Sequence, residues 1–166
     1  MLENLRHPPQ LTHTETAGMV RDEYSLLMDG TVDQLWDLVT DVTRMGRFSP
    51  ENRSGRWLGK SAVGAFFLGF NRIGPVVWAT LCRVTALDPG RSFEFKVYLV
   101  GTRWGYRLEP AGDGVLVTEY REWPTNALMY RLRRVVGGIG ASRDNYALNG
   151  LYRSLERIRE ITRPAA

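Results

Sequence analysis

The middle of the chain alternates apolar with polar residues, and only short turns such as Gly74-Pro75 and Asp88-Pro89-Gly90 interrupt the alternation. A period of two residues is typical of a half-buried strand. Because parallel strands need long crossovers, strands joined this closely must pair antiparallel. The pattern therefore predicts an antiparallel sheet built from successive strands at residues 53–58, 65–73, 76–86, 93–99, 102–109 and 115–123.

One further strand and two short helices are predicted ahead of this sheet. Residues 19–28 alternate in the same way and predict a strand. Thr31 and Gln34 have the spacing of a capping box, which predicts that a helix begins there. Its apolar face is supplied by Leu35, Trp36, Leu38 and Val39. Residues 41–50 are predicted to be a second short helix or an irregular turn, which Pro50 ends.

The last part of the chain has helical periodicity. Residues 144–163 place on one face Leu148, Leu151, Leu155, Ile158 and Ile161. Residues 126–136 are a separate helical candidate, followed by Gly137, Gly138 and Gly140. Since the sheet is the only partner large enough to cover the long helix, the order of elements predicts a two-layer α+β fold. We expect the long helix to pack its apolar face against this sheet.

The length of 166 residues fits one domain, which we place at residues 19–166 after a flexible lead-in at residues 1–18. The chain has one cysteine, Cys82, so an intramolecular disulfide is impossible, and a cytoplasmic location is expected. No signal sequence is evident, and the longest apolar run, residues 62–70, is far shorter than the roughly 20 residues that span a bilayer.

The formal net charge of +4 comes almost entirely from arginine, since Lys60 and Lys96 are the only lysines. The positive charge is spread along the chain, whereas a nucleic-acid site would concentrate it on one stripe with aromatic residues. We therefore expect no nucleic-acid partner. The pattern gives no indication of an oligomeric state.

The residues that usually perform catalysis are few. Both histidines, His7 and His13, fall in the expected lead-in, so we expect no Ser-His-Asp or Cys-His site. No Cys/His spacing suits zinc, and the glycines lack the spacing of a phosphate loop or a dinucleotide site. We expect no metal, no cofactor and no conventional catalytic constellation.

Three segments resemble the START/Bet v 1-like helix-grip superfamily (SRPBCC), which includes bacterial polyketide cyclase/dehydrase-like and lipid-transport-like proteins. The first, EYSLLMDGTVDQLWDLVTDVTRMGRFSPE, is similar in its Leu35-Trp36 pair, Asp41 and Phe48-Ser49-Pro50. The second is WATLCRVTALDPGRSFEF and the third is TRWGYRLEPAGDGVLVTEY. The chain departs from the family pattern in two ways: Thr31 replaces a proline, and the insert at residues 127–142 is long. The resemblance implies a helix-grip fold, in which a curved antiparallel sheet wraps around the long C-terminal helix and leaves an apolar ligand cavity between them.

The candidate ligand-binding residues are the aromatic and polar side chains expected to face that cavity. They are Tyr24, Phe70, Arg72, Trp78, Phe95, Trp104, Tyr106, Glu119, Leu148, Asn149 and Tyr152. For each aromatic residue the alternative is an ordinary core position. For Arg72 and Glu119 the alternative is a cross-strand ion pair on the solvent face, which is slightly favoured. For Asn149 and Tyr152 it is a hydrated edge of the helix.

The insert at residues 127–142 has two interpretations. It is either a solvated basic loop or a lid that touches an anionic lipid surface or an acidic ligand through Arg131, Arg133 and Arg134.

Three functions remain open at this point. The first is a carrier or sensor that binds a hydrophobic small molecule, such as a lipid or a polyketide-like compound. The second is a polyketide aromatase/cyclase or dehydrase that acts in the same cavity, with Glu119, Arg72 and Tyr106 as acid/base or orienting groups. The third is an interaction module without a cavity. The missing catalytic constellation favours the first.

Overall fold

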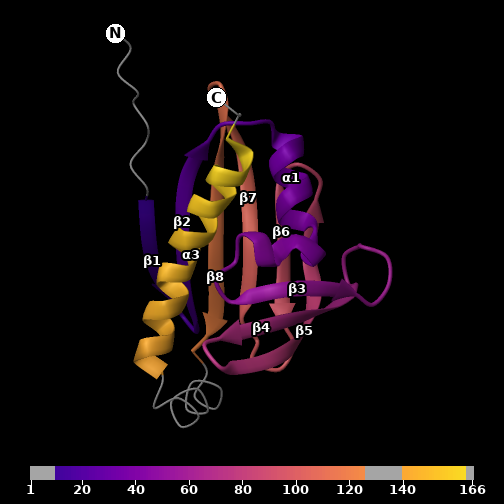
Figure 1. Cartoon of the computed structure of the whole chain (residues 1–166). Helices are drawn as coiled ribbons and strands as arrows, with labels where there is room; N and C mark the ends of the chain where they lie inside the picture. The colour runs from indigo at the N-terminus through magenta and orange to yellow at the C-terminus, as the bar shows by residue number, and fades with distance from the viewer. Residues whose placement is uncertain (1–9, 126–139, 164–166) are drawn as a thin grey trace.

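The fold is an eight-stranded antiparallel sheet with a long helix across one face, shown in a computed structural model that describes residues 10–125 and 140–163 (Figure 1). The strands are β1 Gln10–Thr16, β2 Met19–Met28, β3 Asn52–Trp57, β4 Phe66–Ile73, β5 Val76–Asp88, β6 Ser92–Val97, β7 Arg103–Ala111 and β8 Gly114–Pro124. The helices are α1 Val32–Thr40, the 3-10 helix η1 Val42–Arg47 and α3 Gly140–Thr162. The predicted helix-grip fold is confirmed.

The sheet is a meander that closes back on the first strands. Strands β3 to β8 are neighbours in chain order, and β2 then pairs with β8, so the full order is β1-β2-β8-β7-β6-β5-β4-β3. Every pairing is antiparallel, as the short turns require. Strands β1 and β3 form the two edges.

Strand β1 replaces part of the predicted flexible lead-in. Residues 10–16 pair in register with β2, from Gln10 opposite Ser25 to Thr16 opposite Met19. Gly18, at a φ of 87° that favours glycine, completes the turn between the two strands. The sequence does not predict this strand, because at the sheet edge the side chains on both faces remain exposed and no alternation of apolar and polar residues is required.

The sheet has an inner face that packs under α3 and an outer face toward solvent. In β2 every second side chain, from Val20 to Met28, is buried on the inner face. The apolar side of α3 covers this face with Leu151, Leu155 and Ile158, none of which is exposed. Figure 1 shows α3 running along β2 and β8, with α1 beside it over the next strands. The core therefore lies between the helices and one half of the sheet.

The predicted start of the first helix is confirmed. The Thr31 side chain accepts a hydrogen bond from the Gln34 backbone N–H, and the Gln34 side chain accepts one from the Thr31 N–H. Residues 42–47 form the predicted second short helix, and Phe48 after it is fully buried. Helix α3 begins at Gly140, four residues before the predicted start at residue 144.

Several predictions fall beyond the described part of the chain. The helical candidate at residues 126–136 and the arginines Arg131, Arg133 and Arg134 lie outside the described residues, as does most of the expected lid at residues 127–142. Within the described ranges, no helix has the length and apolar character required to cross a membrane.

Cys82 lies on the inner face of β5, opposite Val97 of β6. Its thiol is 2% exposed. Burial raises the pKa of the thiol to about 11, and a hydrogen bond to Thr80 opposes this shift. The thiol is therefore protonated at neutral pH and behaves as a small apolar core group.

Candidate functional site

Three strands bring their polar inner-face residues to one level of the sheet. Glu119 of β8 lies opposite Tyr24 of β2 on one side and Tyr106 of β7 on the other. Helix α3 covers this level and contributes Ser154, which is 2% exposed. The antiparallel register therefore brings together residues nearly a hundred positions apart in the chain.

Glu119 is the most unusual group in this cluster. It is 4% exposed, and the Tyr106 hydroxyl donates a hydrogen bond of 2.9 Å to its Oε1 atom. Burial raises the pKa of the Glu119 carboxyl to about 8, while the hydroxyl groups of Tyr106 and Ser154 act in the opposite direction. Its Oε2 atom has no hydrogen-bond partner. At neutral pH the side chain is thus mainly a neutral acid with unused hydrogen-bonding capacity.

The two tyrosines beside Glu119 are also held in their neutral form. Burial, reinforced by the neighbouring Glu119, raises the pKa of the Tyr106 hydroxyl. Burial also raises the pKa of Tyr24, whose hydroxyl oxygen is buried without a hydrogen-bond partner. The ring of Tyr24 meets the ring of Tyr152 edge-on, with centroids 5.5 Å apart. Two unpartnered polar atoms, on Tyr24 and Glu119, therefore lie on directly opposed residues.

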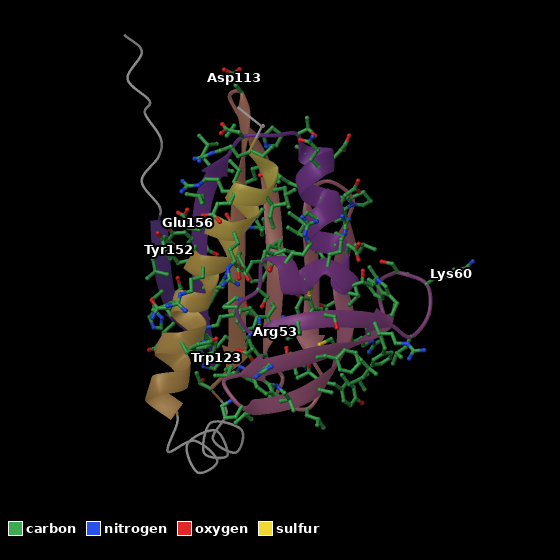
Figure 2. All side chains as sticks on the ribbon, in the orientation of Figure 1. Arg53, Lys60, Asp113, Trp123, Tyr152 and Glu156 are labelled. Carbon is green, nitrogen blue, oxygen red and sulfur yellow. The ribbon has the colours of Figure 1, made fainter. Side chains whose placement is uncertain are left out.

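A buried ion pair lies one level further along the same strands. Arg121 donates two hydrogen bonds, of 2.9 and 2.8 Å, to Oδ2 of Asp22, and both side chains are almost fully buried. The guanidinium carbon of Arg121 lies 4.4 Å from the ring centroid of Trp123. Nδ1 of His13, on β1, lies 2.5 Å from the other Asp22 oxygen. This network ties β1, β2 and β8 together at the end of the sheet where Trp123 lies (Figure 2).

The remaining inner face is aromatic and incompletely covered. Helix α3 packs on β2 and β8, and α1 packs on β7. Beyond them, half-buried apolar side chains adjoin the core from β3, β6 and β7, namely Trp57, Phe95, Val97 and Trp104. Phe67 links two of them, at ring-centroid distances of 5.3 Å from Trp57 and 5.1 Å from Phe95. These side chains form an apolar wall next to the polar cluster.

Most of the predicted site residues share this face. Tyr24, Tyr106 and Glu119 form the polar cluster, and Phe95 and Trp104 belong to the apolar wall. Trp78 is half-buried and shares the inner-face parity of Cys82 in β5. Leu148 packs against the core from α3. Asn149 is exposed, and Tyr152 is 47% exposed along the side of α3 next to β1 and β2 (Figure 2).

Phe70 and Arg72 lie on the opposite face of the sheet. In β4 the inner position is Phe67, which is 1% exposed, so residues of the other parity point outward. The exposed Arg72 side chain donates a hydrogen bond to the Gly74 carbonyl. The slightly favoured alternative, an ion pair of Arg72 and Glu119 on the solvent face, was therefore wrong. Glu119 is buried on the inner face, whereas Arg72 is exposed on the outer face.

Sequence reasoning missed several members of the site. Arg121 and Trp123 have the same parity as Glu119 in β8, and that signal could have placed them on the inner face. Ser154 lies one helical turn before Ile158 and shares its buried side of α3. His13 could not be found, because its strand was not predicted. The described residues hold no cluster of His, Cys, Asp or Glu suited to a metal ion.

Comparison with known proteins identifies the family. The family model described as "Polyketide cyclase / dehydrase and lipid transport" matches residues 19–143. No curated protein matches the sequence.

Solved structures of similar fold include a polyketide-cyclase-like protein from Corynebacterium glutamicum. It is 28% identical with a TM-score of 0.64, over 85% of this chain and 90% of that one. The di-domain ARO/CYC StfQ of the steffimycin biosynthetic pathway is 14% identical with a TM-score of 0.68, over 87% of this chain and 51% of that one. Major latex-like protein 151 from Panax ginseng is 15% identical with a TM-score of 0.63, over 89% of this chain and 100% of that one.

At the two lower identities the likeness concerns the fold alone. The family model, however, covers most of the chain, including strands β2 to β8 and the first turn of α3. The chain therefore belongs to the polyketide cyclase / dehydrase and lipid transport family.

Proposed function

We propose that this protein binds a hydrophobic small molecule, a lipid or a polyketide-like compound, in a cavity between the inner face of the sheet and α3. The proposal rests mainly on one observation: large apolar side chains of the inner face, including Trp57 and Trp104, adjoin the core and are only half-buried. Small-molecule sites are mostly apolar with a few convergent polar groups. The family's description, which includes lipid transport, supports the same reading.

The polar cluster supplies the convergent groups. A ligand hydroxyl or carbonyl oxygen placed between Tyr24 and Glu119 would satisfy polar atoms that are otherwise buried without partners. Because the Glu119 carboxyl is mainly neutral at pH 7, it can donate a hydrogen bond as well as accept one. The ligand is thus expected to be apolar along most of its length with an uncharged oxygen at one end. The contacting residues are expected to be Tyr24, Trp78, Phe95, Trp104, Tyr106, Glu119 and Leu148.

Titration with a fluorescent long-chain alcohol analogue, together with native mass spectrometry of the purified protein, tests binding. Trp104→Ala should weaken binding of the analogue at least tenfold, because it removes a large part of the apolar wall. Trp36→Ala, which removes a half-buried tryptophan from α1, is the matched control and should leave binding unchanged. If neither measurement detects binding to the unmodified protein, or if both variants bind equally well, the proposal fails.

A second candidate is catalysis on a polyketide chain, and the Glu119–Tyr106 pair is the observation that favours it. A carboxyl group whose pKa is near 8 can accept a proton from carbon next to a carbonyl and return one to a departing hydroxyl, near neutral pH. The adjacent Tyr106 hydroxyl, which donates a hydrogen bond to Glu119, can donate to the carbonyl oxygen instead and orient it. Arg72, which lies on the outer face, is excluded from that role.

Glu119→Gln separates the two candidates, because it retains the shape of the side chain and removes its proton transfer. For a carrier, the variant should bind the fluorescent long-chain alcohol analogue within a few-fold of the unmodified protein. For an enzyme, it should abolish cyclisation of a poly-β-keto thioester while binding persists. Tyr106→Phe should then move the pH profile upward, since it removes a hydrogen bond that lowers the pKa of Glu119.

A further inference from the structure

The outer face of the sheet is divided into two chemically different halves. Over β2, β7 and β8 it carries charged side chains that pair with one another. Nε of Arg21 lies 2.9 Å from Glu23, and Arg107 reaches the same carboxylate at 3.3 Å. Arg21 also covers the ring of Tyr120 at 3.9 Å from its centroid. This half has the polar outer surface expected of an antiparallel sheet with one solvated face.

The other half, over β3, β4 and β5, is apolar. We call it the outer patch and define it by Leu58, Phe66, Phe70, Val77, Leu81 and Tyr98. Val77 is 70% exposed, Tyr98 58%, Leu58 53% and Phe70 40%. Phe66 and Tyr98 meet edge-on at a centroid distance of 6.2 Å. Contiguous exposed apolar surface of this kind marks an interaction site.

The outer patch continues onto the tips of two turns and into a shallow groove. Val76, 60% exposed, follows the β4–β5 turn, and Leu99, 82% exposed, lies in the β6–β7 turn. Both turns lie at the end of the sheet near which α3 begins (Figure 1). A groove of about 480 Å³ lies against the patch and is lined by Leu58, Lys60, Phe66 and Leu81 together with Gly59 and Ala65.

Positive charges predominate around the outer patch, where Glu51, whose carbonyl accepts a hydrogen bond from the Arg72 N–H, is a neighbouring acid. Residues 52–87 contain no aspartate or glutamate, yet they hold Arg53, Arg56, Lys60, Arg72 and Arg83. All five side chains are exposed, and none forms an ion pair within the described part of the chain.

Three of these cations lie next to the patch. Arg83 lies 5.7 Å from the Phe66 ring centroid, Arg72 is opposite Val77, and Lys60 lies at the tip of the β3–β4 loop beside the groove (Figure 2). The patch therefore has a cationic rim.

We propose that the outer patch docks the protein onto an anionic lipid surface. Aliphatic side chains at the turn tips, with a tyrosine and long cationic side chains behind them, match the order of acyl chains and anionic headgroups in a bilayer interface. The rim cations can extend to headgroups while their apolar stems stay near the acyl boundary. A second copy of the chain fits poorly, because two such rims would repel each other. The proposal does not depend on what the inner face binds.

Co-sedimentation with lipid vesicles tests the proposal. The full-length protein should bind vesicles of phosphatidylcholine mixed with phosphatidylserine, bind pure phosphatidylcholine far less, and dissociate as salt is raised. Arg72→Gln with Arg83→Gln should weaken binding about 25-fold, because each cation near an anionic surface contributes roughly fivefold. Val77→Asp with Leu99→Asp should abolish binding, because both charges would have to enter the acyl region.

Matched substitutions outside the patch provide the controls. Arg91→Gln removes an exposed cation from the β5–β6 turn, and Leu11→Asp places a charge at an exposed apolar position of β1. Both should bind vesicles normally, and thermal melting of all variants should show that they fold.

Two outcomes would overturn the proposal. One is equal binding by patch and control variants. The other is a failure of the unmodified protein to bind anionic vesicles at low salt. If the unmodified protein does not bind vesicles but forms a dimer that Val77→Asp disrupts, the patch is assigned to a second copy of the chain. If it forms no dimer either, an acidic protein is left as the partner.

Discussion

At the scale of single residues, Glu119 combines burial, a neutral charge state and an unsatisfied oxygen. A carboxyl group buried in this way is less stable in its ionised form, which is why its pKa rises to about 8. In the unfolded chain the same group ionises near 4.5. Between these two pH values the folded protein keeps a proton on Glu119 that the unfolded chain releases. The contribution of Glu119 to stability therefore falls as pH rises through this interval.

Glu119→Gln should remove this dependence. The free energy of unfolding of the unmodified protein should fall as pH rises from about 4.5 to about 8, with a contribution from Glu119 of up to roughly 1.4 kcal/mol per pH unit. In the variant that contribution is absent, so the curve should be flatter over the same interval. Urea unfolding at a series of pH values measures both. Parallel curves would show that Glu119 ionises in the folded protein as it does in the unfolded chain.

The buried pair of Asp22 and Arg121 leads to a second prediction. Asp22→Asn should destabilise the protein by about 3–5 kcal/mol, since it breaks a buried ion pair from one side. Glu23→Gln, on the other face of the same strand, disrupts only half-exposed pairs with Arg21 and Arg107 and should change stability by less than about 1 kcal/mol. Denaturant unfolding compares the two, and equal losses would contradict the role of burial.

At the scale of elements, the sequence predicts correctly those helices and strands that local residue patterns specify. The capping box at Thr31 and the alternation of β2 depend on neighbouring residues alone, and both predictions are confirmed. Strand β1 was missed because its partner, β2, determines it rather than any apolar pattern of its own. The prediction placed the wrong face of β4 toward the core. Phe66 and Phe70 lie on one face of the strand and Phe67 on the other, so the alternation does not show which face is buried.

The capping box should contribute measurably to stability. Thr31→Ala should lower the free energy of unfolding by about 1 kcal/mol, because the Gln34 N–H loses its acceptor at the exposed start of α1. Thr31→Ser keeps the hydroxyl group and should remain within a few tenths of a kcal/mol of the unmodified protein. Thermal unfolding followed by circular dichroism distinguishes them. Identical behaviour of both variants would indicate that tertiary packing alone holds the helix.

At the scale of the whole molecule, β8 is the strand around which the fold is organised. It joins the first hairpin to the meander, and it carries both Glu119 and Arg121. The sequence could predict that Tyr24, Tyr106 and Glu119 share a face, but their meeting at one level requires the pairing of β2 with β8. That pairing connects distant segments, and no local pattern specifies it.

Hydrogen exchange should reflect this arrangement. Backbone amides of β8, with paired strands on both sides and α3 above, should exchange most slowly, close to the rate of global unfolding. Amides of the edge strands β1 and β3 should exchange faster by at least tenfold. Exchange followed by mass spectrometry of peptides resolves the strands. Equal protection of β1 and β8 would show that the sheet opens only as one unit.

The single buried thiol makes the interior observable without labels introduced by mutation. Since Cys82 reacts only when β5 separates from its neighbours and the thiol ionises, the rate at which a maleimide modifies it counts those openings. A molecule bound against the nearby wall of Phe67 and Phe95 would hold the strands closed and slow the reaction. Protection of this thiol by crude lipid fractions would therefore serve as an assay for candidate cargo before its chemical identity is known.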